Sequence, residues 1–367
     1  MPDKKNQESQ AQVLLPSQNL NEDIEFFGKI GFRLMQIYPA DYPATAVMSG
    51  HNITIKIETT ATCSPGIIHL LTDSPENFSA GKTKLQAPNG TIIEIHPLSN
   101  ELKTPPTQHK FEVRQLQDKE PWVIGRAGML YRDLIPDRLG GSIIASHIRI
   151  PQGGPVPDMV HYHTIGFQLI FCYKGWVKVV YEDQGPPIIL NAGDCVTQPP
   201  EIRHRVLESS DNLEVIEIGI PAEHMTSIDH QLKLPNEVIN NQRKFNGQVF
   251  CHHVAKDAAW QPWRLAGFNF RETGINQATN GLASVHVAIF KDAEAKLQKS
   301  SHDADILFTF VLEGGLELST EDQEPHLLKA GDAFVIPPGM IYNLSNVIEK
   351  TELLEVALPG NFITTNN

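Results

Sequence analysis

Three histidines and a glutamine in the middle of the chain are spaced as metal ligands would be. His161 and His163 are two residues apart, Gln168 follows, and His204 comes later in the chain. Residues i and i+2 of a β-strand point to the same face, so one strand can direct both imidazoles into one cavity. Gln168 and His204 would complete a set of four ligands from neighbouring strands. Because imidazole nitrogen is the main donor, the pattern predicts a divalent transition metal.

The residues around these four positions are the main support for a metal site. The chain has 15 histidines, so an isolated pair could arise by chance. A strand-like run at 167–173 ends at Lys174-Gly175, which is typical of a turn. A second run at 176–181 is followed by the remaining features: Gly193-Asp194, Pro199-Pro200 and His204. This order resembles the two sequence motifs of the cupin superfamily. The first is H-x-H, a carboxylate or amide, then Gly; the second is Gly-Asp, Pro, then His.

The resemblance implies a double-stranded β-helix (jelly-roll) barrel that binds metal through His161, His163, Gln168 and His204. Cupins usually have a glutamate at the position of Gln168. A carboxylate would damp the Lewis acidity of the metal, whereas an amide is a weak neutral ligand that leaves a three-His site with open positions. By similarity to three-His cupin dioxygenases, Fe²⁺ is the expected metal. Ni²⁺, Mn²⁺ and Zn²⁺ are the alternatives, including a closed structural zinc site.

An internal repeat indicates that the chain contains two such barrels. Five segments recur 138 or 139 residues later: 126–132 at 265–271, 147–150 at 286–289, 171–175 at 310–314, 191–194 at 329–332 and 214–221 at 352–359. The second copy keeps few of the ligands: Ser300 replaces His161, Leu307 replaces Gln168, Tyr342 replaces His204, and only His163 keeps a histidine, His302. The second barrel is therefore expected to be structural.

The first hundred residues have a different pattern. A strand at 13–16, a helix at 21–30 and strands at 32–38, 44–49 and 52–58 are expected. This β-α-β-β-β order resembles the repeating unit of the glyoxalase, or vicinal-oxygen-chelate, superfamily, and segments near 65–70 and 88–95 resemble parts of a shortened second unit. That family binds metal through a His on the first strand and a Glu on the last, and here only His69 and Glu94 match. The resemblance implies an accessory or dimerising module.

We therefore expect a mostly β protein: two tandem cupin barrels at 106–235 and 236–367, after a small α+β βαβββ module at 1–105 whose first ten or so residues are disordered. The formal net charge is −13, from 30 Lys and Arg against 43 Asp and Glu, and no basic patch stands out, which argues against nucleic acid. No apolar run is long enough for a membrane span. Four unpatterned cysteines and a polar start favour the cytoplasm.

Two further residues are candidates for catalysis in the first barrel. Arg149 shares a strand face with His147, and if that face points inward, Arg149 could bind a substrate carboxylate; a solvent-facing pair is the alternative. Glu217 lies on the alternating strand 214–220 and is the best candidate for a carboxylate near the cavity.

Three functions remain open from the sequence. The first is an O₂-dependent dioxygenase of a small oxygenated or aromatic compound, with the three-His site in the first barrel. The second is a metal-dependent sugar or sugar-phosphate isomerase or epimerase, which would need Arg149, Arg132 or Arg138 in the cavity. The third is a non-enzymatic bicupin that binds a small molecule. Exposed strand edges in two barrels also make a homodimer an expectation.

Overall fold

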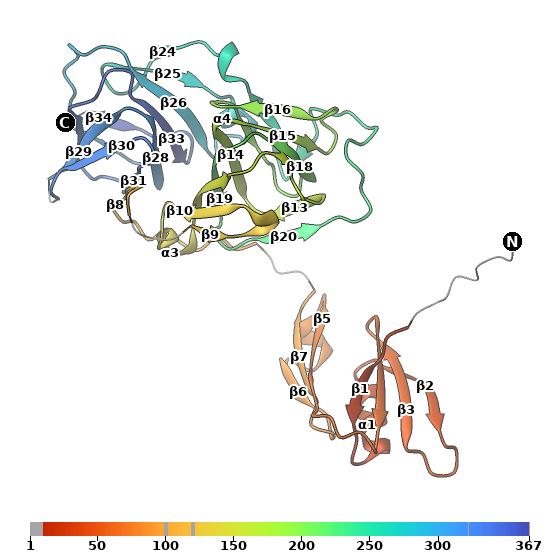
Figure 1. The fold of residues 1–367 in the computed structure, drawn as a ribbon. Coiled ribbons are helices and arrows are strands. Elements are labelled where there is room, and N and C mark those ends of the chain that lie inside the picture. The colour runs from red at the N-terminus through yellow and green to blue at the C-terminus, as the bar shows by residue number, and fades with distance from the viewer. Residues whose placement is uncertain (1–9, 99–101, 119–121, 322, 367) are drawn as a thin grey trace, which may run out of the picture. The chain divides into compact units, whose positions relative to one another are not determined.

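The computed structural model describes residues 10–98, 102–118, 122–321 and 323–366, and the chain forms two compact units, Met1–Glu101 and Leu102–Asn367 (Figure 1). The expected disordered tail concerns mainly residues 1–9, which lie outside the described part of the chain. The expectation of a mostly β protein is confirmed. Among the described residues, no helix is both long and apolar enough to span a bilayer.

The first unit begins with the predicted β-α-β-β-β order. Its elements are β1 (Val13–Pro16), α1 (Leu20–Lys29), β2 (Arg33–Tyr38), β3 (Thr45–Gly50) and β4 (Ile53–Glu58). Asn19 caps α1, because its side chain accepts a hydrogen bond from the backbone N–H of Glu22. The four strands form one sheet in the order β1-β4-β3-β2, with β1 parallel to β4.

A second, smaller sheet completes this unit. It contains β5 (Ile67–Thr72), β6 (Lys84–Gln86) and β7 (Ile92–Pro97) in the order β5-β7-β6, with β5 parallel to β7. A single helical turn, α2 (Pro75–Phe78), lies between β5 and β6 in the sequence. Both sheets and α1 share one hydrophobic core, which includes Phe27, Ile55 and Ile93.

The second unit contains the repeat as two sets of matching elements. The first half has β9 (Val123–Ile124), η1 (Arg126–Gly128), β10 (Leu130–Asp133), α3 (Arg138–Gly141), β11 (Ile144–Ile150), β12 (Gly154–Pro155), β13 (His161–Thr164), β14 (Phe167–Lys174), β15 (Trp176–Tyr181), β16 (Ile188–Asn191), β17 (Cys195–Thr197), β18 (His204–Ser209), β19 (Leu213–Ile220) and β20 (Met225–Ile228). The second half has β24 (Gln261–Pro262), β25 (Phe268–Glu272), α4 (Ile275–Ala278), β26 (Ser284–Phe290), β27 (Ser300–His302), β28 (Ile306–Glu313), β29 (Gly315–Thr320), β30 (His326–Lys329), β31 (Ala333–Ile336), β32 (Tyr342–Ser345), β33 (Glu352–Leu358) and β34 (Thr364–Asn366).

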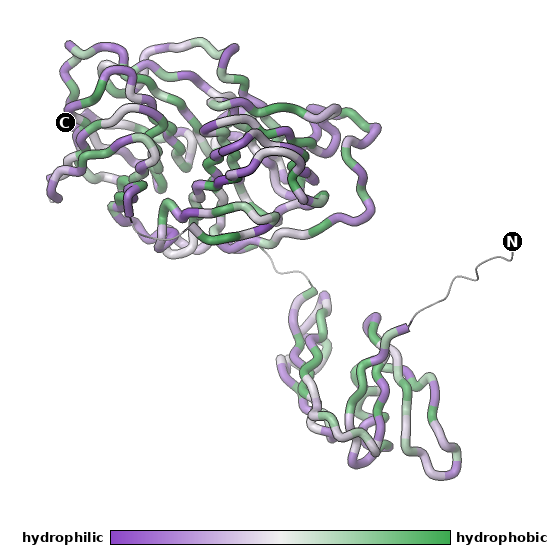
Figure 2. The backbone as a smooth tube through the Cα atoms, in the orientation of Figure 1, coloured by the Kyte–Doolittle hydropathy of each residue, from purple (hydrophilic) through white to green (hydrophobic). Residues whose placement is uncertain are grey.

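Each half is a two-sheet jelly roll with the same strand order. Two further strands, β8 (Glu112–Arg114) and β23 (Cys251–His253), join the larger sheets. The larger sheets run β23-β17-β14-β19-β11-β10-β9 and β24-β25-β26-β33-β28-β31-β8, and the smaller sheets run β16-β15-β18-β13-β20 and β30-β29-β32-β27-β34. The connector between the halves contributes β21 (Lys244–Phe245), β22 (Gln248–Val249), β23 (Cys251–His253) and the short η2 (Ala255–Asp257). In Figure 2, hydrophobic and hydrophilic residues alternate along many strands, as expected for sheets with one buried face.

The two halves exchange equivalent strands. β8 (Glu112–Arg114) precedes the first barrel in sequence but pairs with β31 of the second barrel. β23, 139 residues later, lies before the second barrel but pairs with β17 of the first. One hydrophobic core also contains residues of both halves, such as Phe171 and Phe310. The barrels therefore hold each other in place through shared sheets and a shared core.

Candidate metal centre

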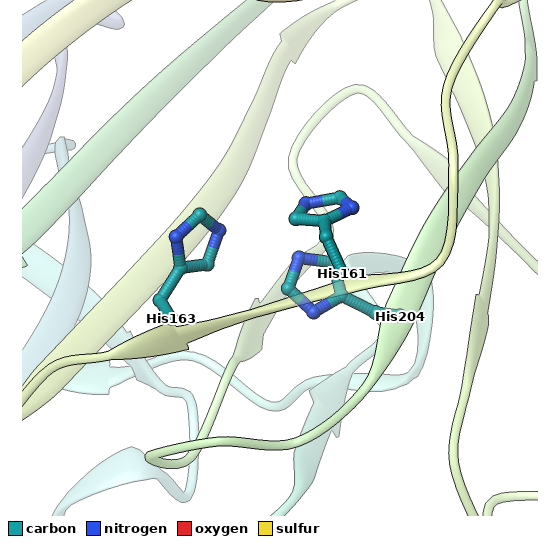
Figure 3. A group of neighbouring side chains, drawn as sticks. All are labelled: His161, His163 and His204. Atoms are coloured by element: carbon teal, nitrogen blue, oxygen red, sulfur yellow. The ribbon is translucent and has the colours of Figure 1, made fainter. Parts of the chain in front are cut away.

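The three predicted histidine ligands lie together in the first barrel. His161 and His163 lie two residues apart on one face of β13. His204 is the first residue of β18, and it pairs directly with His161 in the sheet. One nitrogen of each ring lies within 4.8 Å of the corresponding nitrogens of the other two. Figure 3 shows the three rings grouped around one space. Antiparallel pairing of two short strands is what brings the separate sequence motifs into one cluster.

Two of the rings are oriented by backbone carbonyls. Nδ1 of His161 lies 2.7 Å from the carbonyl oxygen of Met159, and Nδ1 of His204 lies 2.9 Å from that of Ile202. A carbonyl oxygen only accepts, so in both rings Nδ1 carries the proton and donates, and Nε2 keeps its lone pair. Nε2 of His161 is buried and has no hydrogen-bond partner among the described residues. An unpartnered buried lone pair of this kind fits a metal ligand.

The third ring is held from the neighbouring strand β20. Nδ1 of His163 lies 2.9 Å from the hydroxyl oxygen of Thr226, and the two residues are partners in the sheet. Burial lowers the pKa of His163 to about 3, with the neighbouring imidazoles adding to the effect. Burial likewise lowers the pKa of His161 and of His204. All three rings are therefore neutral at ordinary pH, which is the form that binds a metal.

Gln168, the expected fourth ligand, lies on β14 and contacts a carboxylate. Its Nε2 donates a hydrogen bond of 2.5 Å to Oε1 of Glu217, whereas its buried Oε1 has no hydrogen-bond partner among the described residues. The free oxygen is the atom of the amide that can bind a metal. Gln168 is not one of the residues that line the cavity, so its part in metal binding stays a prediction.

The histidines open onto a small and mostly apolar cavity of about 80 Å³. Seventeen residues line it: Arg126, Met129, Tyr131, Ile148, Ile150, His161, His163, Ile170, Val177, Val179, Tyr181, Gln198, His204, Val206, Leu213, Val215 and Glu217. Beyond the histidines most of the lining is apolar, and Ile170 of β14 is part of it. Glu217 faces the same cavity, and burial raises the pKa of its carboxyl group, although the hydrogen bond from Gln168 opposes this.

Arg126 also lines the cavity, although sequence reasoning did not select it. It lies in η1, forms an ion pair with the buried Asp158, and places Nη1 3.4 Å from Nδ1 of His161. Oδ2 of Asp158 also accepts a hydrogen bond of 2.9 Å from the backbone N–H of Val206, which fixes it against β18. The only signal was the repeat, in which Arg126 corresponds to the apolar Leu265.

Arg149 lies elsewhere, so the condition for its proposed role is not met. Its guanidinium donates a 3.0 Å hydrogen bond to Glu214 and lies over the ring of Trp122. His147, on the same strand face, is fully buried, bonds the other oxygen of Glu214 at 2.7 Å and packs against Phe310 of the second barrel. This face of β11 points away from the cavity, which Ile148 and Ile150 of the opposite face line. The second barrel covers His147, whereas the side chain of Arg149 is 34% exposed.

In the second barrel an arginine occupies the corresponding region. Arg264 forms a buried ion pair with Glu355 and donates a 2.9 Å hydrogen bond to the hydroxyl oxygen of Tyr342, which replaces His204. His302 bonds the carbonyl oxygen of Ile336 at 3.0 Å. Among the described residues, the second barrel has no group of three potential metal ligands. This agrees with the loss of ligands seen in the sequence.

In the first unit, the two residues that match the glyoxalase ligands lie close to a third potential ligand, His96. His69 and Glu94 are direct partners on β5 and β7, their side chains are 3.3 Å apart, and His96 follows on the same face. Lys84 also pairs with Glu94, at 3.2 Å. The two histidine side chains are 62% and 46% exposed, so this cluster is a solvated surface group rather than an enclosed site.

Comparisons with known proteins agree with this architecture. Residues 287–356 match the family model of the cupin domain. Salicylate 1,2-dioxygenase from Pseudaminobacter salicylatoxidans has a similar structure, with a TM-score of 0.51 and 13% identity over 72% of this chain and 91% of that chain. Oxalate decarboxylase from Lactobacillus farciminis gives 0.51 and 12%, over 74% and 91%, and protein Ylba from E. coli gives 0.50 and 10%, over 71% and 96%. No curated protein sequence matches the chain.

At these identities the structural similarity shows the fold alone. The fold extends over both halves of the second unit, and the sequence match falls within the second half. The three-histidine cluster lies in the first half. The chain therefore has the tandem fold of the cupin superfamily, with its candidate metal centre in the first barrel.

Proposed function

We propose that this protein is a metal-dependent dioxygenase that acts on a small oxygenated or aromatic compound in the cavity of the first barrel. The observation that carries the proposal is the set of three neutral, oriented imidazoles that face a small, mostly apolar cavity. His161, His163 and His204 would hold the metal, Fe²⁺ being our first choice, with the oxygen of Gln168 as a weak fourth donor. When bound, the metal supplies Lewis acidity and redox chemistry toward O₂.

The size of the cavity supports a small substrate. A volume of about 80 Å³ is that of roughly three water molecules in the liquid, which favours a small substrate over a polymer. Its walls are Ile, Val, Leu and Met side chains that exclude water and favour an apolar body such as a ring. Arg126, Tyr131 and Gln198 provide polar contacts at the cavity surface, which would orient the oxygen atoms of the substrate.

The proposed dioxygenase reaction needs no added reductant. Both atoms of O₂ enter the product, and the substrate supplies all four electrons.

The similar structures support this reaction class only by analogy. Salicylate 1,2-dioxygenase shares the tandem fold, and one of its variants is described in complex with gentisate, a small aromatic acid, at a TM-score of 0.51 and 12% identity. Oxalate decarboxylase shares the fold as well, so the fold does not select between oxygen insertion and decarboxylation.

Oxygen consumption is the direct test. Protein purified without a histidine tag is loaded with Fe²⁺ anaerobically, its iron content is measured, and O₂ uptake is followed with a panel of phenols, catechols, hydroxybenzoates and diketones. We expect uptake with at least one compound and none with the His161→Ala variant. Full iron occupancy without uptake on any compound would refute the dioxygenase and favour a binding protein.

The isomerase alternative loses its main requirement. A phosphorylated sugar needs cationic side chains in the cavity, and Arg149, Arg132 and Arg138 were the candidates. Arg149 bonds Glu214, Arg132 donates to the carbonyl oxygen of Gly331, and Arg138 pairs with Asp133. Arg126, the cationic side chain that lines the cavity, is paired with Asp158.

For the first unit we propose a relationship to the glyoxalase repeating unit and an accessory role. The order β1-β4-β3-β2 with β1 parallel to β4 supports this relationship. The smaller sheet repeats the pattern with one strand fewer, since β5 is parallel to the last strand, β7.

A further inference from the structure

The second barrel contains a largely buried arginine in the region that corresponds to the metal site of the first barrel. In the second barrel, Arg264 reaches into the region of the lost metal site. It makes a two-point ion pair with Glu355, in which Nε lies 3.2 Å from Oε1, and it donates to Tyr342 at 2.9 Å and to the hydroxyl of Thr364 at 3.5 Å. The Glu355 side chain is 2% exposed and that of Arg264 is 16% exposed, so the cation is held inside the barrel.

The repeat relates these partners to the first barrel residue by residue. The counterparts of Glu355, Tyr342 and Thr364, each 138 residues earlier, are Glu217, His204 and Thr226. The sheet register agrees, because Thr364 pairs with His302 and Thr226 pairs with His163. Arg264 itself corresponds to Gly125, which has no side chain. The first barrel therefore keeps the surroundings of the cation but lacks the arginine.

Among the described residues, no cationic side chain forms an ion pair with Glu217 of the first barrel. Its side chain lines the cavity together with the three histidines, and its hydrogen bond comes from the neutral amide of Gln168. Arg126 lines the same cavity but is engaged by Asp158. Removing a charged carboxylate from water costs free energy unless a positive charge lies beside it. The three imidazoles are neutral, so they do not balance the negative charge of Glu217. A cation bound from solution would therefore stabilise the ionised form of Glu217.

We propose that Glu217 is the carboxylate that balances the charge of the metal in the first barrel, and that Arg264 is a built-in cation that replaces the metal in the second. The carboxylate absent at Gln168 is thus supplied by the adjacent strand β19, and the amide of Gln168 positions it. This inference rests on the proposed metal site. It implies that the bound ion does not carry its full charge uncompensated, contrary to what Gln168 alone indicates.

Metal affinity, rather than activity, tests the proposal. Co²⁺ is titrated into the metal-free protein, and its dissociation constant is obtained from visible absorption and calorimetry. Glu217→Gln keeps the size of the side chain and its ability to bond Gln168 but removes the charge, so we expect Co²⁺ affinity to fall about tenfold or more. The control is Glu208→Gln on β18, which removes an equal charge outside the cavity and should change affinity less than twofold.

A swapped pair separates charge from hydrogen bonding. The double variant Gln168→Glu with Glu217→Gln keeps one amide and one carboxylate in contact but moves the charge to β14. We expect its Co²⁺ affinity to return to within about threefold of the wild type. Wild-type affinity in Glu217→Gln would overturn the inference and leave the three-His site intact. Failure of the swap to restore affinity would also overturn it, and absence of Co²⁺ binding in the wild type would overturn both the inference and the proposed function.

Discussion

The buried ion pair of the second barrel gives the most quantitative prediction. Replacing Arg264 by methionine keeps much of the side-chain volume but leaves the carboxylate of Glu355, which is 2% exposed, without a partner. Removal of one member of a buried ion pair typically costs about 3–5 kcal/mol. For a cooperative unit of residues 102–367, an unfolding entropy of about 2.1 cal/mol/K per residue converts this cost into a Tm decrease of roughly 5–9 °C.

The assay is thermal unfolding followed by circular dichroism and calorimetry, supported by urea titration. Lys299→Met is a matched control, since Lys299 pairs with Glu321 at 3.7 Å while both side chains are more than half exposed, and it should change stability by less than about 1 kcal/mol. The double variant Arg264→Met with Glu355→Gln should recover a large part of the loss, because no unpaired charge remains. A Tm of Arg264→Met within 2 °C of the control would refute the reasoning.

Three further predictions follow from the first barrel. His163→Ala should abolish metal binding measured by elemental analysis, whereas His302→Ala at the equivalent position of the second barrel should leave the metal content unchanged; equal losses would contradict a single site. Ile170→Phe should fill the cavity and abolish binding of small phenols, measured by calorimetry, at unchanged metal content, while Ile189→Phe on the exposed side of β16 should not. Burial raises the pKa of Glu214, but the hydrogen bond from His147 and the nearby cations outweigh burial and hold it at about 2. This pKa lies below the unfolded value of about 4.3, so the ionised carboxylate adds up to roughly 3 kcal/mol to the free energy of unfolding. That contribution is fully present above pH 4.3 and is lost as the pH falls through 2. Acid unfolding of Glu214→Gln should therefore show a weaker pH dependence between pH 4.5 and 2.

Most of the fold could be predicted because the repeat and the strand pattern are local properties of the sequence. Segments such as 167–173 and 176–181 alternate with turn residues, and the structure has β14 and β15 there. The equal spacing of matching segments requires two copies of one architecture, whatever its details. The exchange of β8 and β23 between the barrels was not visible, since strand pairing depends on neighbours that lie far away in the sequence.

The functional residues divide in the same way. His161, His163 and His204 could be found from spacing, because residues two apart on a strand share a face. Alternation does not say which face is inward, and for this reason Arg149 was considered for a cavity from which it points away. Arg126 comes from a short 3₁₀ turn, η1, where no periodic pattern marks direction.

The sequence by itself determined that the chain contains two related barrels, that three histidines in the first can meet, and that the second has lost all but one of them. Only the tertiary structure decided what surrounds those histidines. Carbonyl groups fix two of the rings, the amide of Gln168 faces Glu217, and Arg264 takes the place of a cation beside Glu355. The physical reason is that ligand spacing is a short-range property of a strand, whereas the balance of charge in a buried cavity depends on side chains that arrive from several strands at once.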